Sequence, residues 1–409
     1  MRKDWAECTF EDLLDYVQPT KYIVKSTNYN DDFKTPVLTA GKTFIKGYTD
    51  ETDGIFDNLP TIIFDDFTTA TQFVNFKFKV KSSAMKILVP KSKLVNIHLI
   101  FYAMQVNQIR NDTHKRYWIS VFAKKKFQLP PLVEQTAIFK KIEELFSSLD
   151  SGIADLKKAQ EQLLIYRQAV MKRAFEGQYT ERKIIDIAYV NTGGTPKRGN
   201  TDFWKNGTIP WVTSTVVNND FVTEPSEYIT EKAIKDTNCK IIPKGSLLVA
   251  MYGEGKTRGK CSELKIDTTT NQALAGITIF DEFKDSKQFV KWFFIKNYEE
   301  IRLLSSGGVQ PNLNLSIIKN TIIPFPDPKE QKKIVQEIES RLSVCDKVEE
   351  SIAESLVKAK ALRQSILKKA FEGKLLSAAE IAKCKLDKDY EPAGVHENVS
   401  VKNAKKTVF

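Results

Sequence analysis

The tetrapeptide Ala174-Phe175-Glu176-Gly177 occurs a second time in the chain as Ala370-Phe371-Glu372-Gly373, 196 residues later. The dipeptides Glu134-Gln135 and Arg167-Gln168 return at the same displacement, so no gap interrupts the alignment. Over the 49 aligned positions 15 residues are identical, which is too many for composition alone. An internal repeat of this kind decides the architecture before any single motif does. The chain therefore alternates between variable and repeated segments.

The repeat divides the 409 residues into five predicted segments, which fits a length that exceeds one ordinary domain. They are a first variable region (1–129), a first helical repeat (130–178), a second variable region (179–325), a second helical repeat (326–376) and a C-terminal tail (377–409). We expect the tail to be loose, with one short helix near residues 378–383, because it lacks hydrophobic periodicity.

Each copy of the repeat has the end signals of one long helix. Prolines open both copies, at 130–131 and at Pro326 and Pro328, where the missing N–H of the first turn costs nothing. Gly177 and Gly373 follow the last turn, as is usual just past a helix end. These signals predict helices over about 132–176 and 328–372.

Apolar residues within the repeats recur with a period of 3.5, which is typical of a coiled coil. The predicted seam residues are Ile138, Ile142, Leu145, Leu149, Leu156, Leu163, Tyr166 and Val170 in the first copy, and Ile334, Ile338, Cys345, Val348, Ile352, Leu362 and Ile366 in the second. A single helix cannot bury its own seam, so we expect the two copies to pack on each other antiparallel. The alternative is a pair of surface helices, each packed on a separate core.

The two variable regions read as mixed α/β domains with much strand. Thr61–Phe64, Phe76–Lys81 and Ser246–Met251 have buried-run or alternating strand patterns. Gln288–Ile295 is apolar enough for a buried helix or a buried strand. The fold class is therefore α/β, with two mixed domains joined by two long helices that form an antiparallel coiled coil.

Net charge indicates the kind of partner, and cysteine usage indicates the cellular compartment. The net charge is +11, and 8 of these 11 charges lie in the two variable regions, which favours a polyanion as partner. The five cysteines are scattered and have no metal-ligand spacing, as in reduced proteins of the cytosol. No apolar stretch reaches the length of a membrane span, and the first residues show no secretory signal. We expect a cytoplasmic protein.

The glycine-rich segment Tyr252–Lys260 follows a predicted strand and carries three basic residues, Lys256, Arg258 and Lys260. Flexible backbone with basic side chains suits DNA, whereas the alternative is an ordinary solvated hairpin. Arg258 is our candidate for a bidentate contact to guanine. A nucleotide-binding P-loop is disfavoured, because Ala250 stands where that motif needs glycine and an extended segment follows.

Further candidates for DNA contact lie outside this segment. In the second variable region they are Trp211, Ser214 and Gln310; in the first they are Lys46, Lys115 and Arg116. Lys115 and Arg116 belong to the basic and aromatic segment His114–Trp118, which we interpret as a DNA-facing strand or, alternatively, as a plain exposed strand edge.

Signals for catalysis are not found. His98, His114 and His396 are far apart in sequence and have no triad context. The chain has no glycine-rich methyl-donor fingerprint and no Asn/Asp-Pro-Pro-aromatic tetrapeptide, and paired carboxylates such as Asp65-Asp66 lack the spacing of a metal nuclease. We therefore expect no catalytic, cofactor or metal site on this chain.

Layout and motifs together resemble the specificity subunit of type I restriction-modification systems over about residues 1–376. The most specific signals are the Pro-x-x-x-Glu-Gln entry and the Arg-Gln and Ala-Phe-Glu-Gly exit of both repeats. Phrases common in such subunits are Thr35-Pro36-Val37-Leu38, Ile45-Lys46-Gly47-Tyr48, Gly193-Gly194-Thr195-Pro196, Ile209-Pro210-Trp211-Val212 and Gly308-Val309-Gln310-Pro311-Asn312. The tail departs most from this pattern.

The resemblance implies a non-catalytic DNA-recognition subunit. Its variable regions would be two target recognition domains, each reading one half of a bipartite double-stranded DNA sequence, and the helices would set the spacer between the halves. Two modification (methyltransferase) subunits would dock on the repeats, and restriction subunits would join them. S-adenosylmethionine, ATP and Mg²⁺ would then be bound by those partners.

Two other classes of protein stay open at this point. One is a coiled-coil scaffold with non-specific DNA binding, which a salt-titrated competition between random and selected DNA would reveal. The other is a fused nuclease or methyltransferase, which activity of the purified chain with S-adenosylmethionine and DNA would reveal.

Overall fold

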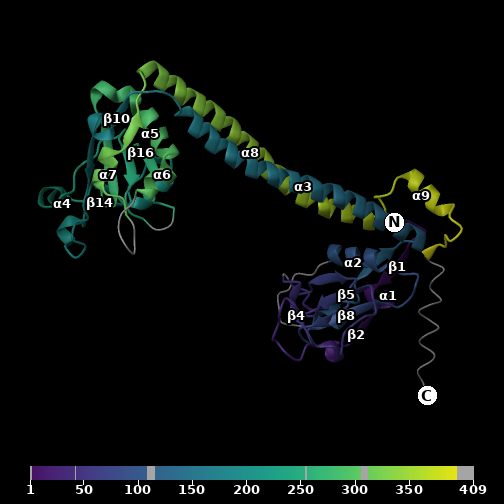
Figure 1. Ribbon diagram of the computed structural model, residues 1–409. Helices are drawn as coiled ribbons and strands as arrows, with labels where there is room; N and C mark the ends of the chain where they lie inside the picture. The colour runs from purple at the N-terminus through teal and green to yellow at the C-terminus, as the bar shows by residue number, and fades with distance from the viewer. Residues whose placement is uncertain (1, 42, 108–115, 254–255, 305–311, 394–409) are drawn as a thin grey trace. The chain divides into compact units, whose positions relative to one another are not determined.

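The computed structural model describes residues 2–41, 43–107, 116–253, 256–304 and 312–393 (Figure 1). They fold into two compact units: Met1–Lys157 together with Ala353–Phe409, called unit 1, and Lys158–Ile352, called unit 2. The borders lie inside the repeats, so each repeat contributes one half to each unit. The five segments drawn from sequence similarity stay a prediction, because compactness instead groups each variable region with the helix halves that it packs against.

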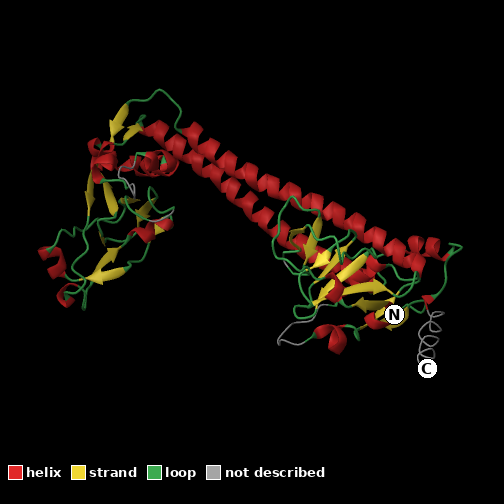
Figure 2. Ribbon diagram, turned by 60° about the horizontal axis from the view of Figure 1, so that its bottom comes forward, coloured by secondary structure: helices red, strands yellow, loops and turns green. Residues whose placement is uncertain are grey.

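Both repeats form one long helix, as predicted. α3 spans Leu132–Ala174 and α8 spans Pro328–Phe371, the two longest helices in Figure 2. Asp327 caps α8, since its Oδ1 accepts hydrogen bonds from two backbone N–H groups of the first turn at 2.9 and 3.1 Å. Gly373 ends the helix with a φ of +70°, the left-handed conformation that favours glycine. At 1.5 Å per residue each helix is about 65 Å long.

The buried face of α8 repeats every seven residues. Ile338, Cys345, Ile352, Ala359 and Ile366 are all buried. Of the other predicted seam positions of α8, Ile334 is buried as well, whereas Val348 and Leu362 are 42% and 51% exposed; Tyr166 on α3 is 44% exposed. Between Ile338 and Ala359 only one position per heptad is fully buried, since two helices alone make a narrow seam. No helix in the described part of the chain is long and apolar enough to cross a membrane.

Within unit 1 the first half of α3 packs on the last half of α8. Ile138 and Ile142 share an apolar cluster with Ile366 and Ala370. Farther along α3, Asp150 accepts hydrogen bonds from the Arg363 guanidinium at 2.8 Å. Residue numbers therefore rise on one helix as they fall on the other, which confirms antiparallel packing within this unit.

Within unit 2 the same contact returns with the roles of the helices exchanged. Arg167 on α3 donates to Asp346 on α8 at 2.6 Å and to Glu349 at 3.0 Å. Arg167 and Asp346 are the repeat counterparts of Arg363 and Asp150, because both pairs differ by 196 positions. The Arg of the Arg-Gln motif thus joins the two helices in both units.

The variable region of unit 1 holds three sheets and one helix of three turns. The strand orders are β1-β9, β2-β8-β5-β6 and β4-β3-β7. The strands are β1 Ala6–Thr9, β2 Leu14–Val17, β3 Thr35–Leu38, β4 Ile45–Thr49, β5 Thr61–Asp65, β6 Thr71–Val74, β7 Lys79–Val80, β8 Met85–Pro90 and β9 Lys126–Leu129; the helices are α1 Phe10–Leu13 and α2 Ile97–Val106. β1 and β9 pair antiparallel, so the region begins and ends at one place, next to the start of α3.

The variable region of unit 2 is built in the same way, from a two-stranded, a five-stranded and a three-stranded sheet. The strand orders are β10-β19, β11-β18-β15-β16-β13 and β14-β12-β17. The strands are β10 Glu181–Lys183, β11 Ala188–Thr192, β12 Ile209–Val212, β13 Phe221–Val222, β14 Glu227–Ile229, β15 Leu247–Ala250, β16 Cys261–Leu264, β17 Thr269–Thr270, β18 Leu274–Ile279 and β19 Ile322–Pro324; the helices are α4 Glu231–Asp236, α5 Lys287–Lys296, α6 Tyr298–Leu303 and α7 Leu315–Asn320.

The two variable regions share one topology although their sequences do not align. β2-β8-β5-β6 corresponds to β11-β18-β15-β16. β3 pairs antiparallel with β4 and parallel with β7, and β12 pairs in the same way with β14 and β17. Even the contact to the repeat is equivalent: Tyr102 on α2 donates to Glu143, and Trp292 on α5 donates at 3.4 Å to Glu339, the repeat counterpart of Glu143.

Two predictions of local structure were wrong in the first variable region. Tyr117 and Trp118 are buried and start a helical turn of π type, Trp118–Phe122, where we predicted an exposed strand. Trp118 is instead an edge-on neighbour of Phe64 in the core. Within Phe76–Lys81 only β7 is a strand. In the second region the ambiguous Gln288–Ile295 is the helix α5.

The tail is packed and not loose up to residue 393, which corrects our expectation. The predicted short helix is α9, Ala378–Lys385, and Leu376 and Cys384 are buried against the α3–α8 pair. Asp4 anchors the rest: it accepts hydrogen bonds from Tyr390 Oη at 3.1 Å and, through its backbone O, from Ala393 N at 3.3 Å. Hydrophobic periodicity missed this contact, because α9 buries a face of only two or three residues.

Candidate nucleic-acid interface

Several loops of unit 2 meet at one end of its sheets. Backbone hydrogen bonds join them: Met251 N donates to Ala273 O at 2.8 Å, Asn271 N to Val212 O at 3.2 Å, and Leu313 N to Met251 O at 3.1 Å. We call residues 193–200, 213–218, 251–253, 256–260 and 271–273 the loop edge of unit 2. Loops held together in this way on a rigid scaffold are the usual carriers of binding residues.

The glycine-rich segment connects β15 to β16 as a hairpin, so a strand follows it and not the helix of a P-loop. Arg302 on α6 donates to Arg258 O at 2.8 Å, and Tyr298 Oη donates to Lys256 O at 2.7 Å. Gly259 has a φ of +87°, and a Cβ there would lie 3.0 Å from Arg302 Cγ. The described part of the hairpin is therefore fixed on α6 by its backbone.

The three basic candidates of this hairpin differ in exposure. Lys256 is exposed, whereas Arg258 and Lys260 are half-buried. Lys260 Nζ donates to Asn218 Oδ1 at 2.9 Å, which ties the hairpin to the 3₁₀ turn Ser214–Asn218. Ser214 is half-buried at the start of that turn. The structure thus brings Ser214 and the three basic candidates to one edge.

Trp211 does not belong to the exposed part of this edge, which corrects our prediction. Its side chain is 1% exposed, and its Nε1 donates to Gly194 O at 3.0 Å. The neighbouring Gly193 approaches β17 so closely that a Cβ would lie 1.8 Å from Thr270 O. Trp211 therefore supports the 193–200 loop from beneath, and the close approach to β17 requires glycine at position 193.

Sequence reasoning missed Arg198 in the same loop. Its guanidinium lies 3.9 Å from the Trp204 ring centroid and makes two hydrogen bonds, of 2.5 and 2.7 Å, to the Glu227 carboxylate. These bonds lower the pKa of Glu227 and raise the pKa of Arg198. Nearby, Thr195 Oγ1 donates to Gln272 Oε1 at 2.9 Å. The dipeptide Lys197-Arg198 directly after Gly193–Pro196 was the signal that could have pointed here.

Unit 1 has an equivalent loop edge, formed by the same three backbone contacts. Asp66 N donates to Ala84 O at 2.9 Å, Lys81 N to Leu38 O at 3.0 Å, and Tyr117 N to Asp66 O at 2.9 Å. Lys46, Lys81 and Arg116 are exposed around these contacts, at the start of β4, after β7 and before Tyr117. Lys81 was not predicted. The candidates Lys115 and Gln310 lie outside the described residues.

A buried carboxylate lies on β16 of unit 2, where the strand meets the start of α5. Glu263 on β16 is 2% exposed, and Lys265 and Lys287 each donate to it at 2.9 Å. Burial raises the pKa of Glu263, but the hydrogen bonds from Lys287, Lys265 and Gln288 outweigh burial and lower it to about 2. The ionised form is therefore the one that stabilises the fold.

This pKa gives a prediction for acid stability. The folded pKa of Glu263 lies below the unfolded value of about 4.3, so its stabilisation is present above pH 4.3 and is lost as the pH falls towards 2. We expect Glu263→Gln to remove about 1–2 kcal/mol at pH 6 and about half as much at pH 3. Urea denaturation at both pH values measures this. The exposed Glu282→Gln is the control, and an equal loss at both pH values for Glu263→Gln would contradict the assignment.

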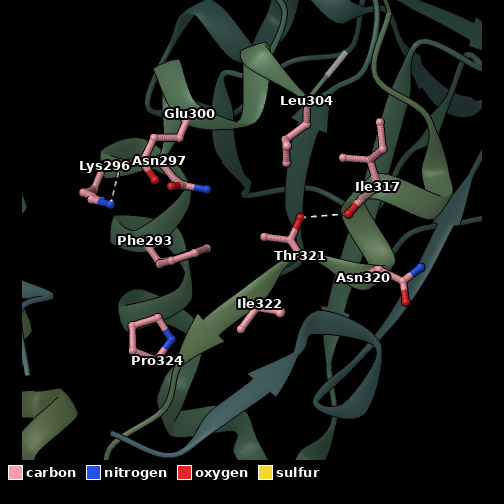
Figure 3. A pocket seen from close by; sticks show the side chains of 10 residues that line it. All are labelled: Phe293, Lys296, Asn297, Glu300, Leu304, Ile317, Asn320, Thr321, Ile322 and Pro324. Carbon is pink, nitrogen blue, oxygen red and sulfur yellow. Dashed lines mark hydrogen bonds and ion pairs between the residues drawn. The ribbon is translucent and has the colours of Figure 1, made fainter. Parts of the chain in front are cut away.

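The cavity drawn in Figure 3 lies elsewhere, between α5, α6, α7 and β19. It has a volume of about 600 Å³ and is lined by Phe293, Lys296, Asn297, Glu300, Leu304, Ile317, Asn320, Thr321, Ile322 and Pro324. Its only charged residues, Lys296 and Glu300, pair with each other at 3.0 Å. This lining offers no nucleophile with an adjacent base, so the cavity has no features of a catalytic site.

Comparisons with known proteins agree with this architecture. The family model described as "Type I restriction modification DNA specificity domain" matches residues 2–161 and 176–356. The specificity subunit of the type I restriction enzyme EcoR124I/EcoR124II from Escherichia coli is 31% identical over 371 residues, covering 86% of this chain and 89% of that protein. The MjaVIII specificity subunit from Methanocaldococcus jannaschii is 22% identical over 374 residues, covering 83% and 86%.

Solved structures show the same fold at low sequence identity. The HsdS subunit from Thermoanaerobacter tengcongensis matches with a TM-score of 0.61 at 15% identity, over 92% of this chain and 98% of that one. A chain from a study of complex assembly and conformational transition of the type I R-M system matches with a TM-score of 0.67 at 15% identity, over 92% and 99%.

Proposed function

Because the chain belongs to the family of type I restriction-modification DNA specificity proteins, we propose that it reads a double-stranded DNA target in two halves, one with the loop edge of each unit. The observation that carries this proposal is the duplicated edge. Two regions of unlike sequence present loops through the same three backbone contacts. A shared frame with different side chains is what two readers of different sequences require.

We assign the DNA contacts to residues at these edges. In unit 2, Arg258 is the candidate for guanine, with Ser214, Lys256 and Lys260 beside it; Gln310 stays a candidate by sequence only. In unit 1, Lys46, Lys115 and Arg116 have the corresponding role. Exposed lysines contact phosphates, which gives affinity without sequence preference, whereas arginine can form two hydrogen bonds to one guanine.

The paired helices have a second role in this proposal, as the spacer between the half-sites and as the docking surface for two methyltransferase subunits. Apolar side chains that the helix pair leaves exposed support the docking role; they are Leu164, Ile165, Val344, Val357 and Leu362. The restriction subunits join through this complex. S-adenosylmethionine, ATP and Mg²⁺ are bound by the partners, and the chain itself does no chemistry. Because its target is DNA, we expect the protein to act in the cytoplasm.

The test removes one base contact and one phosphate contact from the same hairpin. In the assembled methyltransferase, Arg258→Ala should relax one base position in one half-site and cost roughly 1–3 kcal/mol. Lys256→Ala should weaken all sequences alike and lower the salt slope by about one unit. Genome-wide mapping of methylated motifs and salt-titrated binding read out both effects.

Lys284→Ala provides the matched control, because Lys284 is exposed beyond the opposite end of β18. If Arg258→Ala keeps the full stringency of both half-sites and full affinity, Arg258 does not read DNA. If binding of random DNA equals binding of selected DNA throughout, the chain is a scaffold with non-specific affinity.

A further inference from the structure

Arg198 is held in one orientation at the loop edge of unit 2. Its Nη1 and Nη2 donate to the two carboxylate oxygens of Glu227 at 2.5 and 2.7 Å, so the carboxylate occupies the end of the guanidinium. Two parallel hydrogen bonds of this kind fix the plane of an arginine, which a lysine ammonium does not have. The pair still lies at the surface, because the Arg198 side chain is 53% exposed and the Glu227 side chain is 42% exposed.

Aromatic rings fix one face of the same guanidinium. Arg198 Cζ lies 3.9 Å from the Trp204 ring centroid and 5.0 Å from the Trp211 ring centroid. The two rings pack edge-on at 5.2 Å and belong to one apolar cluster. Arginine stacks well on such rings, because its cation is planar and weakly hydrated. Arg198 therefore rests on a packed support while its side chain stays accessible.

One edge of the Arg198 guanidinium has no partner among the described residues. This edge consists of Nε–H and of the N–H group of Nη2 on the same side, since Glu227 takes only the N–H groups at the end of the guanidinium. Two parallel donors at this spacing match the O6 and N7 acceptors that guanine presents in the major groove. They also match two oxygens of a phosphate group.

Charge favours the base over the phosphate. The hydrogen bonds from Arg198 lower the pKa of Glu227, so the carboxylate is ionised and neutralises the guanidinium. A phosphate would meet a pair without net charge and with a carboxylate directly behind it. The edge of guanine carries no net charge, and its recognition depends on the direction of the donors. A fixed, neutralised guanidinium is therefore suited to reading a base.

The position of the pair within unit 2 agrees with this role. Glu227 is the first residue of β14, and Ser226 before it accepts a hydrogen bond at its Oγ from Thr213 N at 3.2 Å. Thr213 directly precedes the 3₁₀ turn of the loop edge, to which Lys260 of the basic hairpin is joined. Arg198 is thus linked to the same edge as the basic hairpin.

We propose that Arg198 is a second guanine-reading residue of unit 2, held in its reading position by Glu227 and Trp204. Glu227 is then a positioning residue, because it acts on the base only through Arg198. The inference rests on the proposed reading of DNA by the loop edges, and it adds one G·C position to the half-site of unit 2, beside the position assigned to Arg258.

The experiment uses the assembled methyltransferase, with genome-wide mapping of methylated motifs and binding to duplexes that differ at one base pair. Arg198→Lys keeps the positive charge and loses the two parallel donors. We expect it to weaken binding of the selected sequence roughly tenfold and to relax one G·C position in one half-site. This position should differ from the one that Arg258→Ala relaxes.

Arg182→Lys is the matched control. Arg182 is likewise an exposed arginine on aromatic rings, since its Cζ lies 5.2 Å from the Phe283 ring centroid and 5.4 Å from that of Phe325. It belongs to β10, outside the loop edge. The control variant should leave every base position of both half-sites unchanged.

Glu227→Gln distinguishes reading from mere support of the loop. Glutamine keeps an acceptor for Arg198 and removes the negative charge. We expect the same G·C position to relax, by less than in Arg198→Lys. We also expect the salt slope of binding to all sequences to increase by about one unit, because one more cation is free to neutralise a phosphate. Support of the loop alone would leave the salt slope unchanged.

The results that would overturn the inference differ from those that would overturn the proposed function. If the wild type methylates a bipartite motif and Arg198→Lys keeps full stringency at every position, Arg198 does not read DNA. An equal loss at all positions of the half-site would assign Arg198 to loop support, and relaxation only at the position of Arg258 would show that it is no separate reader. A wild type without a bipartite motif would overturn the proposed function itself.

Discussion

Replacing Arg2 with alanine is expected to destabilise unit 1 by about 3 kcal/mol, although Arg2 stands at the edge of the sequence. Its partner Glu134 is 0% exposed, so the substitution leaves a buried carboxylate without its cation. Removing one partner of a buried pair costs far more than the pair contributes, because the remaining charge stays out of water. The effect should reach α9, since Asp4 links Arg2 to Lys385, the last residue of that helix, at 3.2 Å.

Replacing the other partner of the pair, as in Glu134→Gln, should reduce the stability of unit 1 by clearly less. The Arg2 side chain is 20% exposed and keeps Asp4 at 2.8 Å, and the glutamine oxygen can still accept from Trp5. Hydrogen exchange of the peptides around residues 1–9 and 376–393 measures both variants locally, which avoids a single unfolding energy for a chain of two units. Equal exchange rates in Arg2→Ala and the wild type would show that the pair is not needed.

Trp211→Ala is expected to have the second large effect, a loss of about 3–5 kcal/mol in unit 2. Trp211 packs edge-on against Trp204 at 5.2 Å and shares a cluster with Ile229, Ala233 and Cys239. Alanine would empty this site beneath the 193–200 loop. We therefore also expect loss of recognition of one DNA half-site, because the 193–200 loop would lose its support and not because a base contact would be missing.

Trp211→Phe separates these two roles. It keeps most of the packing and loses the hydrogen bond to Gly194 O, so it should cost about 1 kcal/mol and preserve the half-site. Hydrogen exchange of unit 2 and methylation mapping provide the two readouts. If Trp211→Phe relaxes one base position while unit 2 stays as stable as the wild type, Trp211 contacts DNA after all.

Sequence predicted the long helices well because their signals are local. Prolines, glycines and a seven-residue apolar period all lie within each repeat, and they placed α3 and α8 within a few residues of their ends. The strand segment His114–Trp118 failed for the opposite reason. Aromatic residues in an isolated pentapeptide fit either an exposed strand or a core, and only the distant Phe64 decides that Trp118 is buried.

The loop edges were predicted in part. A basic, glycine-rich hairpin is visible in sequence, so Lys256, Arg258 and Lys260 could be named. Arg198 could not, because its position depends on Glu227 and Trp204, which come from other elements. Trp211 was chosen as a DNA-binding candidate for a related reason. A tryptophan near a turn can be a binding residue or a core residue, and only the burial of its ring distinguishes the two.

The packing of the tail against Asp4 has a consequence for how the polypeptide can be cut and joined. Asp4 and Ala393 meet backbone to backbone at 3.3 Å, next to the end of α8. At the corresponding place in unit 2, the chain runs without a break from the end of α3 at Ala174 to β10 at Glu181. A short peptide link from residue 393 to residue 2, with a new opening between residues 177 and 180, would give a circular permutant that keeps the contacts of Arg2 and Asp4, with only a small change in loop-closure entropy. The fold therefore does not require that either unit comes first in the polypeptide.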